Sequence, residues 1–275
     1  MICTFALCFL SHTKKKYVMN DGIIQIIKSF LKTDDDDITR VRVSSEIRLD
    51  QSLSIYGFEN PASIIKLAIL GKMNRLDFKY IRKKMSSNLQ ELDISEATID
   101  NNRIPNKAFD HCSNLTSIAL PNTILEIRKK TFSFCSSLTS ISIPSSVIKI
   151  EELAFYRCTG LTSIIIPEAV TEIKFRAFSD CTALTSIIIP NSVINIGSAA
   201  FGNCTNLTSV TLPDSEIEIG NFAFYNCTSL TSIFIPKNVI LIGEGVFENC
   251  PAYITVDPDN PFYSSEDGKL ISKSM

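Results

Sequence analysis

The feature that most constrains this chain is a sequence repeat with a period of 23 residues. Seven cysteines lie 23 positions apart without insertion or deletion: Cys112, Cys135, Cys158, Cys181, Cys204, Cys227 and Cys250. Around each of them the sequence follows, with some substitutions, the pattern A-F-x-x-C-x-x-L-T-S-I-x-I-P-x-x-V-x-x-I-x-x-x. A fixed period of about 20–50 residues is typical of solenoids and propellers. The chain therefore folds by stacking similar units that bury each other's apolar side chains.

Each unit contains one clear strand signal, L-T-S-I-x-I, whose apolar residues alternate as in a half-buried strand. The proline that follows ends this strand, because proline cannot donate to a ladder. A propeller blade needs four strands and about 40 residues, so a one-strand unit favours a solenoid. We predict a leucine-rich-repeat solenoid with one short parallel β-strand per 23-residue coil and an irregular α/β N-terminal cap. V-x-x-I forms a second short buried segment, and A-F-x-x-C forms helical or 3₁₀ turns on the opposite side.

The invariant columns of the repeat predict the core. Phenylalanines repeat with the same period, at Phe109, Phe132, Phe155, Phe178, Phe201, Phe224 and Phe247. One thiol per unit indicates a row of free, buried cysteines, because metal sites prefer two close ligands such as C-x-x-C. Glu216 interrupts the V column, and we expect its side chain to reach solvent while Ile217 or neighbouring methylene groups cover the gap.

Stretches such as "AFYRCTGLTSIIIP" and "NCTNLTSVTLP" resemble the BspA-like leucine-rich repeat family. The resemblance is strong over residues 104–251, and it implies a non-enzymatic surface antigen of the adhesin type. We divide the chain into an unassigned leader (1–46), an N-terminal cap with one or two irregular coils (47–103), the BspA-like repeats (104–250), and a C-terminal partial unit or cap (251–275). Within the cap, "MNRLDFKYIRKKM" has the spacing of a short amphipathic helix.

Composition argues against several classes of function. The net charge is −2, so a nucleic-acid partner, which needs a basic face, is not expected. Only two histidines occur, and no phosphate-binding glycine motif is present, so we expect no catalytic residues, no cofactor and no metal. No segment reaches the roughly 20 apolar residues of a membrane span. Residues 1–20 form a poor signal peptide, since their lysines follow the apolar run.

The variable x of L-T-S-I-x-I is the candidate binding column. It contains Ala119, Ser142, Ile165, Ile188, Thr211 and Phe234, and it is flanked by threonines that include Thr162, Thr185 and Thr208. If this column faces solvent, two isoleucines lie side by side on a sheet face that solenoids use for binding. The alternatives are that β-branched residues simply favour strands, or that a flanking segment covers them.

The leading hypothesis is a non-enzymatic scaffold that binds a protein, with a host or microbial surface protein as the partner that the resemblance implies. The resemblance also implies an extracellular or cell-surface location. An intracellular or purely structural interaction module is the alternative, with a cytoplasmic location. Carbohydrate binding is a third hypothesis, but Phe234 is the only aromatic residue in the x column.

Overall fold

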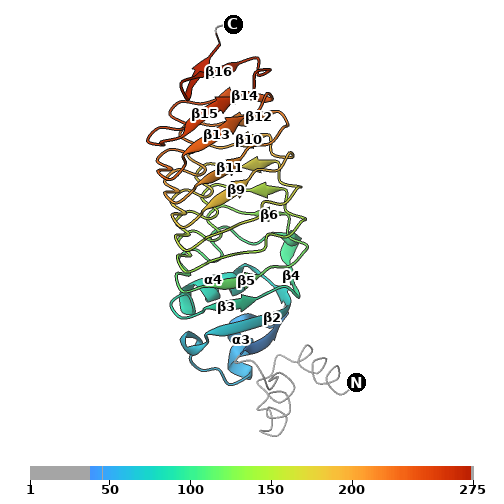
Figure 1. Cartoon of the computed structure of the whole chain (residues 1–275). Helices are drawn as coiled ribbons and strands as arrows, with labels where there is room; N and C mark the ends of the chain where they lie inside the picture. The colour runs from blue at the N-terminus through green and yellow to red at the C-terminus, as the bar shows by residue number, and fades with distance from the viewer. Residues whose placement is uncertain (1–37, 45, 274–275) are drawn as a thin grey trace.

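The chain forms one elongated stack of coils in the computed structural model, which describes residues 38–44 and 46–273 (Figure 1). The helices α3 and α4 lie at the N-terminal end of the stack, and β16 lies at the opposite end. The predicted solenoid is confirmed, because strands one period apart pair in parallel, as Glu126 does with Lys149 and Lys149 with Glu172. The expectation for residues 1–20, and most of the leader assigned to 1–46, lies outside the described residues.

The N-terminal elements form the first turns of the stack. They are β1 (Thr39–Val43), α3 (Leu49–Ile55), the 3₁₀ helix η1 (Pro61–Ser63), β2 (Lys66–Met73), α4 (Arg75–Lys84), β3 (Glu91–Asp93), β4 (Ala97–Ile99) and the 3₁₀ helix η2 (Asp100–Asn102). β1 pairs with β2, β2 with β3, and β3 with β5 (Ser117–Ala119), all in parallel. The N-terminal elements and the first regular coil therefore share one sheet.

The predicted amphipathic helix is α4, and its start is fixed by a capping box. Asn74 accepts a hydrogen bond from the Leu76 N–H at 2.8 Å, and Asp77 accepts one from the Asn74 N–H at 2.8 Å. Such reciprocal bonds satisfy N–H groups that have no partner inside the helix. Asp77 also accepts a bond from the Leu49 N–H at 2.7 Å, so one carboxylate ties the starts of α3 and α4 together.

The most regular ladder lies on the return segment V-x-x-I. Its six parallel strands are β6 (Glu126–Ile127), β7 (Lys149–Ile150), β8 (Glu172–Ile173), β10 (Asn195–Ile196), β12 (Ile217–Ile219) and β14 (Val239–Ile242). The L-T-S-I-x-I segments contain β5, β9 (Ser186–Ile188), β11 (Ser209–Thr211) and β13 (Ser232–Ile235), and β13 pairs with β15 (Tyr253–Val256).

Two coils differ from the expectation of one strand in every L-T-S-I-x-I segment. Residues 139–143 and 162–166 have no assigned strand, although their sequences match the pattern. A regular ladder needs successive backbone hydrogen bonds. The Thr162 N–H bonds to the Thr139 carbonyl at 3.0 Å, but the Thr139 N–H reaches the Thr116 carbonyl only at 3.5 Å.

The A-F-x-x-C segments form a series of turns rather than a continuous helix. Bonds of the 3₁₀ type occur within them, for example from the Cys158 N–H to the Phe155 carbonyl at 3.1 Å. Positive φ angles interrupt each turn at the residue before cysteine: His111, Phe134, Arg157, Asp180, Asn203, Asn226 and Asn249. Neighbouring turns also bond to one another, since the Phe155 N–H donates to the Ala177 carbonyl at 2.7 Å. The turns therefore form a third line of contacts along the stack.

The core consists of the columns that the repeat predicts. The six phenylalanines from Phe109 to Phe224 are fully buried, and their rings stack in a row, with 5.1 Å between the Phe155 and Phe178 centroids. Free cysteines lie beside them, buried in every coil except at Cys250, and the Cys181 thiol donates to the Phe155 carbonyl at 3.2 Å. From Cys135 to Cys250, each cysteine fills a small space while its S–H group donates to a backbone carbonyl.

The expectation for Glu216 is confirmed. Its side chain is exposed, and Ile217 is fully buried in its place. The register shifts between Ile217 and Glu218, so that Ile217 pairs with Val239 of the next coil. Ile240 of β14 is thereby left without a partner in β12, as in a β-bulge, and pairing resumes at Leu241.

An antiparallel hairpin, β16 (Tyr263–Glu266) and β17 (Lys269–Ser272), covers the last coil. The Ile254 N–H of β15 donates to the Gly268 carbonyl at 2.9 Å. On the other side of the coil, the Ile242 N–H of β14 donates to the Tyr263 hydroxyl at 2.8 Å. These contacts occupy backbone groups at the edges of both ladders, where an unpaired strand would be prone to aggregate.

Candidate functional site

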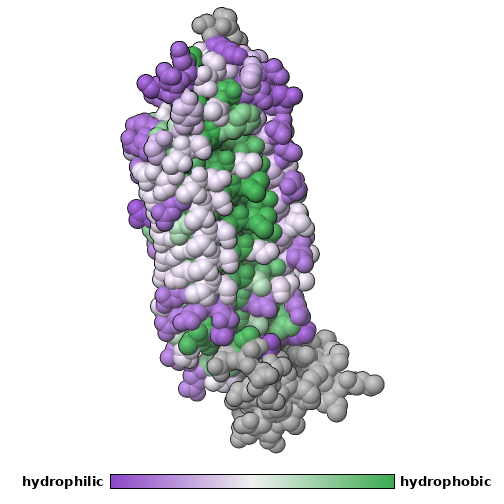
Figure 2. All heavy atoms as spheres, viewed as in Figure 1, coloured by the Kyte–Doolittle hydropathy of each residue, from purple (hydrophilic) through white to green (hydrophobic). Residues whose placement is uncertain are grey.

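The candidate binding column faces solvent along the whole repeat array. Ile165 is 84% exposed, Ile188 69% and Phe234 50%. The smaller members of the column are also exposed: Ala119, Ser142 and Thr211. No flanking segment covers the column in the described residues. Figure 2 shows apolar side chains gathered in a stripe along the axis, beside a paler column of small polar residues.

Backbone pairing brings the column together. Ile188 of β9 pairs with Thr211 of β11, so their side chains lie next to each other on one face. Phe234 of β13 pairs with Thr255 of β15. In β13 the neighbours Ile233 and Ile235 are buried, which is the alternation that turns Phe234 outward. The face is therefore held rigidly by residues that belong to the core.

The threonine column lies on the same face but acts mainly within the fold. The hydroxyls of Thr162, Thr185 and Thr208 each donate to the threonine carbonyl of the preceding coil, at 3.2, 3.4 and 3.0 Å. The acceptors of these hydroxyls are therefore backbone carbonyls and not other hydroxyl groups. These hydroxyl protons are already used, so the threonines offer a partner mainly their methyl groups and oxygen lone pairs.

A second exposed apolar row lies outside the candidate set. Leu125, Ile148 and Ile194 are 37%, 46% and 59% exposed, and they occupy the first x of V-x-x-I. The Ile148 N–H bonds to the Leu125 carbonyl at 2.9 Å, which places the two side chains on adjacent coils. The signal in the sequence is an x position that is apolar in most coils. The exposure of this position was not predicted from the sequence, because the V-x-x-I segment could bury it whether the segment were helical or extended.

Aromatic and charged side chains form another cluster, on the turns. His111 stacks on Phe134 at 4.3 Å, and Phe134 meets Tyr156 edge-on at 5.4 Å. The Arg157 guanidinium lies 5.4 Å from the centroids of both the Phe134 and the Tyr156 rings. Cation–π contacts of this kind order long side chains at a surface. The aromatic faces in this cluster are thus engaged by neighbours rather than free.

The chemistry available to the described residues is limited. No group of three or more His, Cys, Asp or Glu side chains in residues 38–44 and 46–273 is placed to hold a metal ion. Burial raises the pKa of the Cys112 and Cys204 thiols to about 12, so these thiols are protonated and non-nucleophilic at neutral pH. His111 lies 3.0 Å from Asp110 and stacks on a phenylalanine, while His12 is outside the described residues.

Within the described part of the chain, no helix has the length and apolar character that a bilayer span requires.

Comparison with known proteins finds one leucine-rich repeat family and several similar solved structures. Residues 79–197 and 172–267 match the family described as "BspA type Leucine rich repeat region". No curated protein matches the chain. Among solved structures, a leucine-rich cell surface protein from Faecalibacterium prausnitzii is 34% identical with a TM-score of 0.57, over 68% of this chain and 47% of that one. The chain thus spans about half the length of that protein.

Two more distant structures share the fold. A leucine-rich repeat protein from Bacteroides ovatus is 22% identical with a TM-score of 0.56, over 78% of this chain and 65% of that one. The leucine-rich repeat protein of T. pallidum is 24% identical with a TM-score of 0.51, over 81% of this chain and 87% of that one.

Proposed function

Because the chain belongs to the BspA-type leucine-rich repeat family, we propose that it is a non-enzymatic recognition scaffold that binds a protein through the x column of its L-T-S-I-x-I face. The observation that carries the proposal is the pair Ile165 and Ile188, which are 84% and 69% exposed on adjacent coils. Large apolar side chains grouped on the surface of a soluble protein typically mark an interaction site.

The rigidity of the face supports the same proposal. Every second residue of the strands lies in the core, and the threonine hydroxyls beside the column bond to the backbone. A partner would therefore meet side chains whose positions are already fixed. Binding to such a face loses little conformational entropy on the scaffold side, which favours affinity. Phe234, at 50% exposure, supplies an aromatic side chain of the kind that dominates interface energetics.

The setting that we propose is the cell surface or the extracellular medium, with a host or microbial surface protein as the partner. The support is the F. prausnitzii relative, which is described as a cell surface protein. Labelling of intact cells with a membrane-impermeant biotin reagent tests the location. Labelling that appears only after lysis would instead support the intracellular interaction module.

Substitution of the two isoleucines tests the binding face. The chain is immobilised, partners are captured from host and microbial surface extracts, and affinity for a purified partner is then measured. Ile165→Asp together with Ile188→Asp is expected to weaken binding at least 100-fold, because each change places a charge in a desolvated contact. Both side chains are exposed, so the free energy of unfolding should change by about 0.5 kcal/mol or less.

The matched control is Ile148→Asp together with Ile194→Asp, which places the same charges in the second apolar row. This pair is expected to leave the affinity unchanged. Equal loss in both double variants would show that binding does not depend on the x column. Retention of binding by Ile165→Asp with Ile188→Asp would contradict the proposal directly, and glycan-array binding without a protein partner would replace it with carbohydrate recognition.

A further inference from the structure

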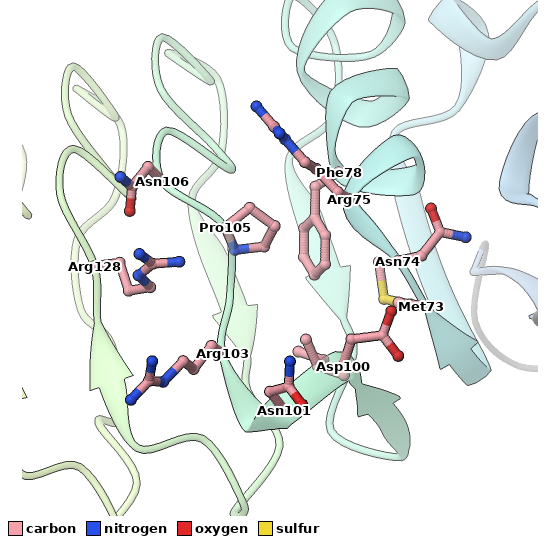
Figure 3. A pocket seen from close by; sticks show the side chains of 11 residues that line it. Met73, Asn74, Arg75, Phe78, Asp100, Asn101, Arg103, Pro105, Asn106 and Arg128 are labelled. Carbon is pink, nitrogen blue, oxygen red and sulfur yellow. The ribbon is translucent and has the colours of Figure 1, made fainter.

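A cavity of about 470 Å³ lies where the N-terminal cap meets the first regular coil (Figure 3). Its apolar wall includes Met73, Phe78, Ile99 and Pro105. In Figure 3 the Phe78 ring faces Pro105 across the space, and Arg128 points toward Pro105 from the next coil. A space of this size matches the pockets that hold small molecules, about 300–1,000 Å³.

The space exists because a helix and a coil do not stack with the same spacing. α4 needs about 10 Å with its side chains, whereas neighbouring coils lie about 4.8 Å apart. In later coils the backbone N–H at this position donates a hydrogen bond to a carbonyl of the preceding coil. The Glu151 N–H donates to the Ile127 carbonyl at 2.9 Å, and the Lys174 N–H donates to the Ile150 carbonyl at 2.9 Å. Pro105 occupies the equivalent position in the first coil and has no N–H, so it cannot make that bond to the cap.

The cavity wall is strongly cationic. It contains three guanidinium groups, from Arg75, Arg103 and Arg128, against one carboxylate, from Asp100. That carboxylate is neutralised by Lys72, which lies 3.2 Å away. Among the described residues Arg75 takes part in no ion pair, so its charge is uncompensated.

Arg103 and Arg128 share a single acidic partner. Glu126 lies 3.4 Å from an Arg103 terminal nitrogen but 3.9 Å from Arg128 Nε, beyond hydrogen-bond reach. Arg128 Nε is buried and has no hydrogen-bond acceptor among the described residues. A buried N–H of a charged group without an acceptor is costly, and such groups in native proteins normally have a partner. Arg128 therefore has an unpaired Nε–H group, and its side chain, which is 33% exposed, lines the cavity beside the apolar wall.

We propose that this cavity binds a small organic oxyanion, a carboxylate or a phosphate ester with a compact apolar body. Arg128 forms the primary contact, since a guanidinium presents two parallel N–H groups to such an anion. Arg75 contributes charge at the rim, and Pro105, which is half-buried, contacts the apolar body of the ligand. The site is distinct from the x column, and its existence does not depend on the proposed function.

Calorimetric titration of the full chain with four probes tests the site: phenyl phosphate, benzoate, inorganic phosphate and neutral benzamide. The expected result is saturable binding of phenyl phosphate or benzoate that weakens as salt is raised, with no binding of benzamide. Tighter binding of phenyl phosphate identifies a phosphate ester as the ligand, and tighter binding of benzoate identifies a carboxylate. Inorganic phosphate should bind more weakly than phenyl phosphate because it cannot contact the apolar wall.

Substitutions then locate the binding. Arg128→Gln is expected to weaken the binding of the preferred probe at least tenfold, whereas Arg176→Gln on a distant turn should leave it unchanged. Arg128→Lys keeps the charge beside Glu126 but lacks the paired N–H groups. If Arg128→Gln is unstable, weaker probe binding by Arg128→Lys tests the role of Arg128 instead. Absence of binding up to 10 mM probe, equal binding of benzamide, or unchanged binding by both Arg128 variants would each overturn the proposal.

Discussion

The row of stacked phenylalanines provides the sharpest test of how this solenoid is stabilised. Phe178 is fully buried between Phe155 and Phe201, with centroid distances of 5.1 and 5.2 Å and interplanar angles of 4° and 5°. Phe178→Ala removes the whole ring and both stacking contacts. Neighbouring coils hold the backbone in a fixed register, so the space cannot close. We therefore expect destabilisation of about 3–5 kcal/mol, the range for large cavities in rigid cores.

The matched control for this substitution is Phe247→Ala at the end of the row. Phe247 is only partly buried, and it stacks on one ring, Phe224, at 5.9 Å. Its replacement should cost about half as much or less, because less apolar surface is lost. Both variants and the parent chain are unfolded in urea and followed by circular dichroism, with m-values compared to check that the transition remains the same.

Two results would refute this reasoning. A loss below about 1 kcal/mol for Phe178→Ala would mean that the stack relaxes around the cavity, contrary to the rigid register assumed here. Equal losses for the central and terminal positions would mean that the stability of the chain does not depend on burial between two neighbouring coils. In a stack with nearest-neighbour coupling, a central defect interrupts two interfaces and a terminal one interrupts a single interface.

The thiol ladder carries two further predictions. Iodoacetamide at pH 8 should modify Cys250 in the folded chain, because that thiol is half-buried and a hydrogen bond with Cys227 lowers its pKa, while Cys112 through Cys227 should react only after unfolding. Peptide mass mapping identifies the modified sites, and rapid labelling of Cys181 would contradict the buried ladder. The folded state should also lose stability as pH rises from about 9 toward 12, since burial raises the pKa of Cys204 from 9.0 to about 12 and only the unfolded chain ionises in that window. Chemical unfolding at several pH values measures this loss, and Cys204→Ala should reduce its slope by about 1.4 kcal/mol per pH unit. An unchanged slope in that variant would show that the thiol ionises in the folded state.

The sequence alone determined the class of fold and the content of the core. A period of 23 residues without insertions places equivalent residues on top of one another in any stack, whatever the local backbone. The burial of the phenylalanines and the free thiols follows from that register. The outward direction of Ile165 follows from the alternation of apolar residues in its segment, and the displacement of Glu216 was visible as a single break in an apolar column.

Only the tertiary structure decided where the ladders are regular. Residues 139–143 match the strand pattern but form no strand, whereas Lys149–Ile150 on the return segment belongs to a six-stranded sheet. Hydrogen bonds between coils depend on the distance between backbones, and a repeat pattern does not encode that distance. The left-handed turns were equally hidden, since residues as different as Phe134 and Asn203 adopt the same positive φ. Contacts between neighbouring turns impose that conformation even where a side chain disfavours it.

The cavity at the cap lay furthest from prediction. Of its three arginines, Arg75 precedes Arg103 by 28 residues and Arg103 precedes Arg128 by 25, so they occupy no common column of the repeat. They meet because one helix interrupts a stack of coils, and a mismatch of spacing leaves a space that no local pattern specifies. A period records what each coil shares with the next, so it describes the regular part of this protein well. Where the regularity ends, the arrangement depends on how two different shapes meet, which only the folded chain shows.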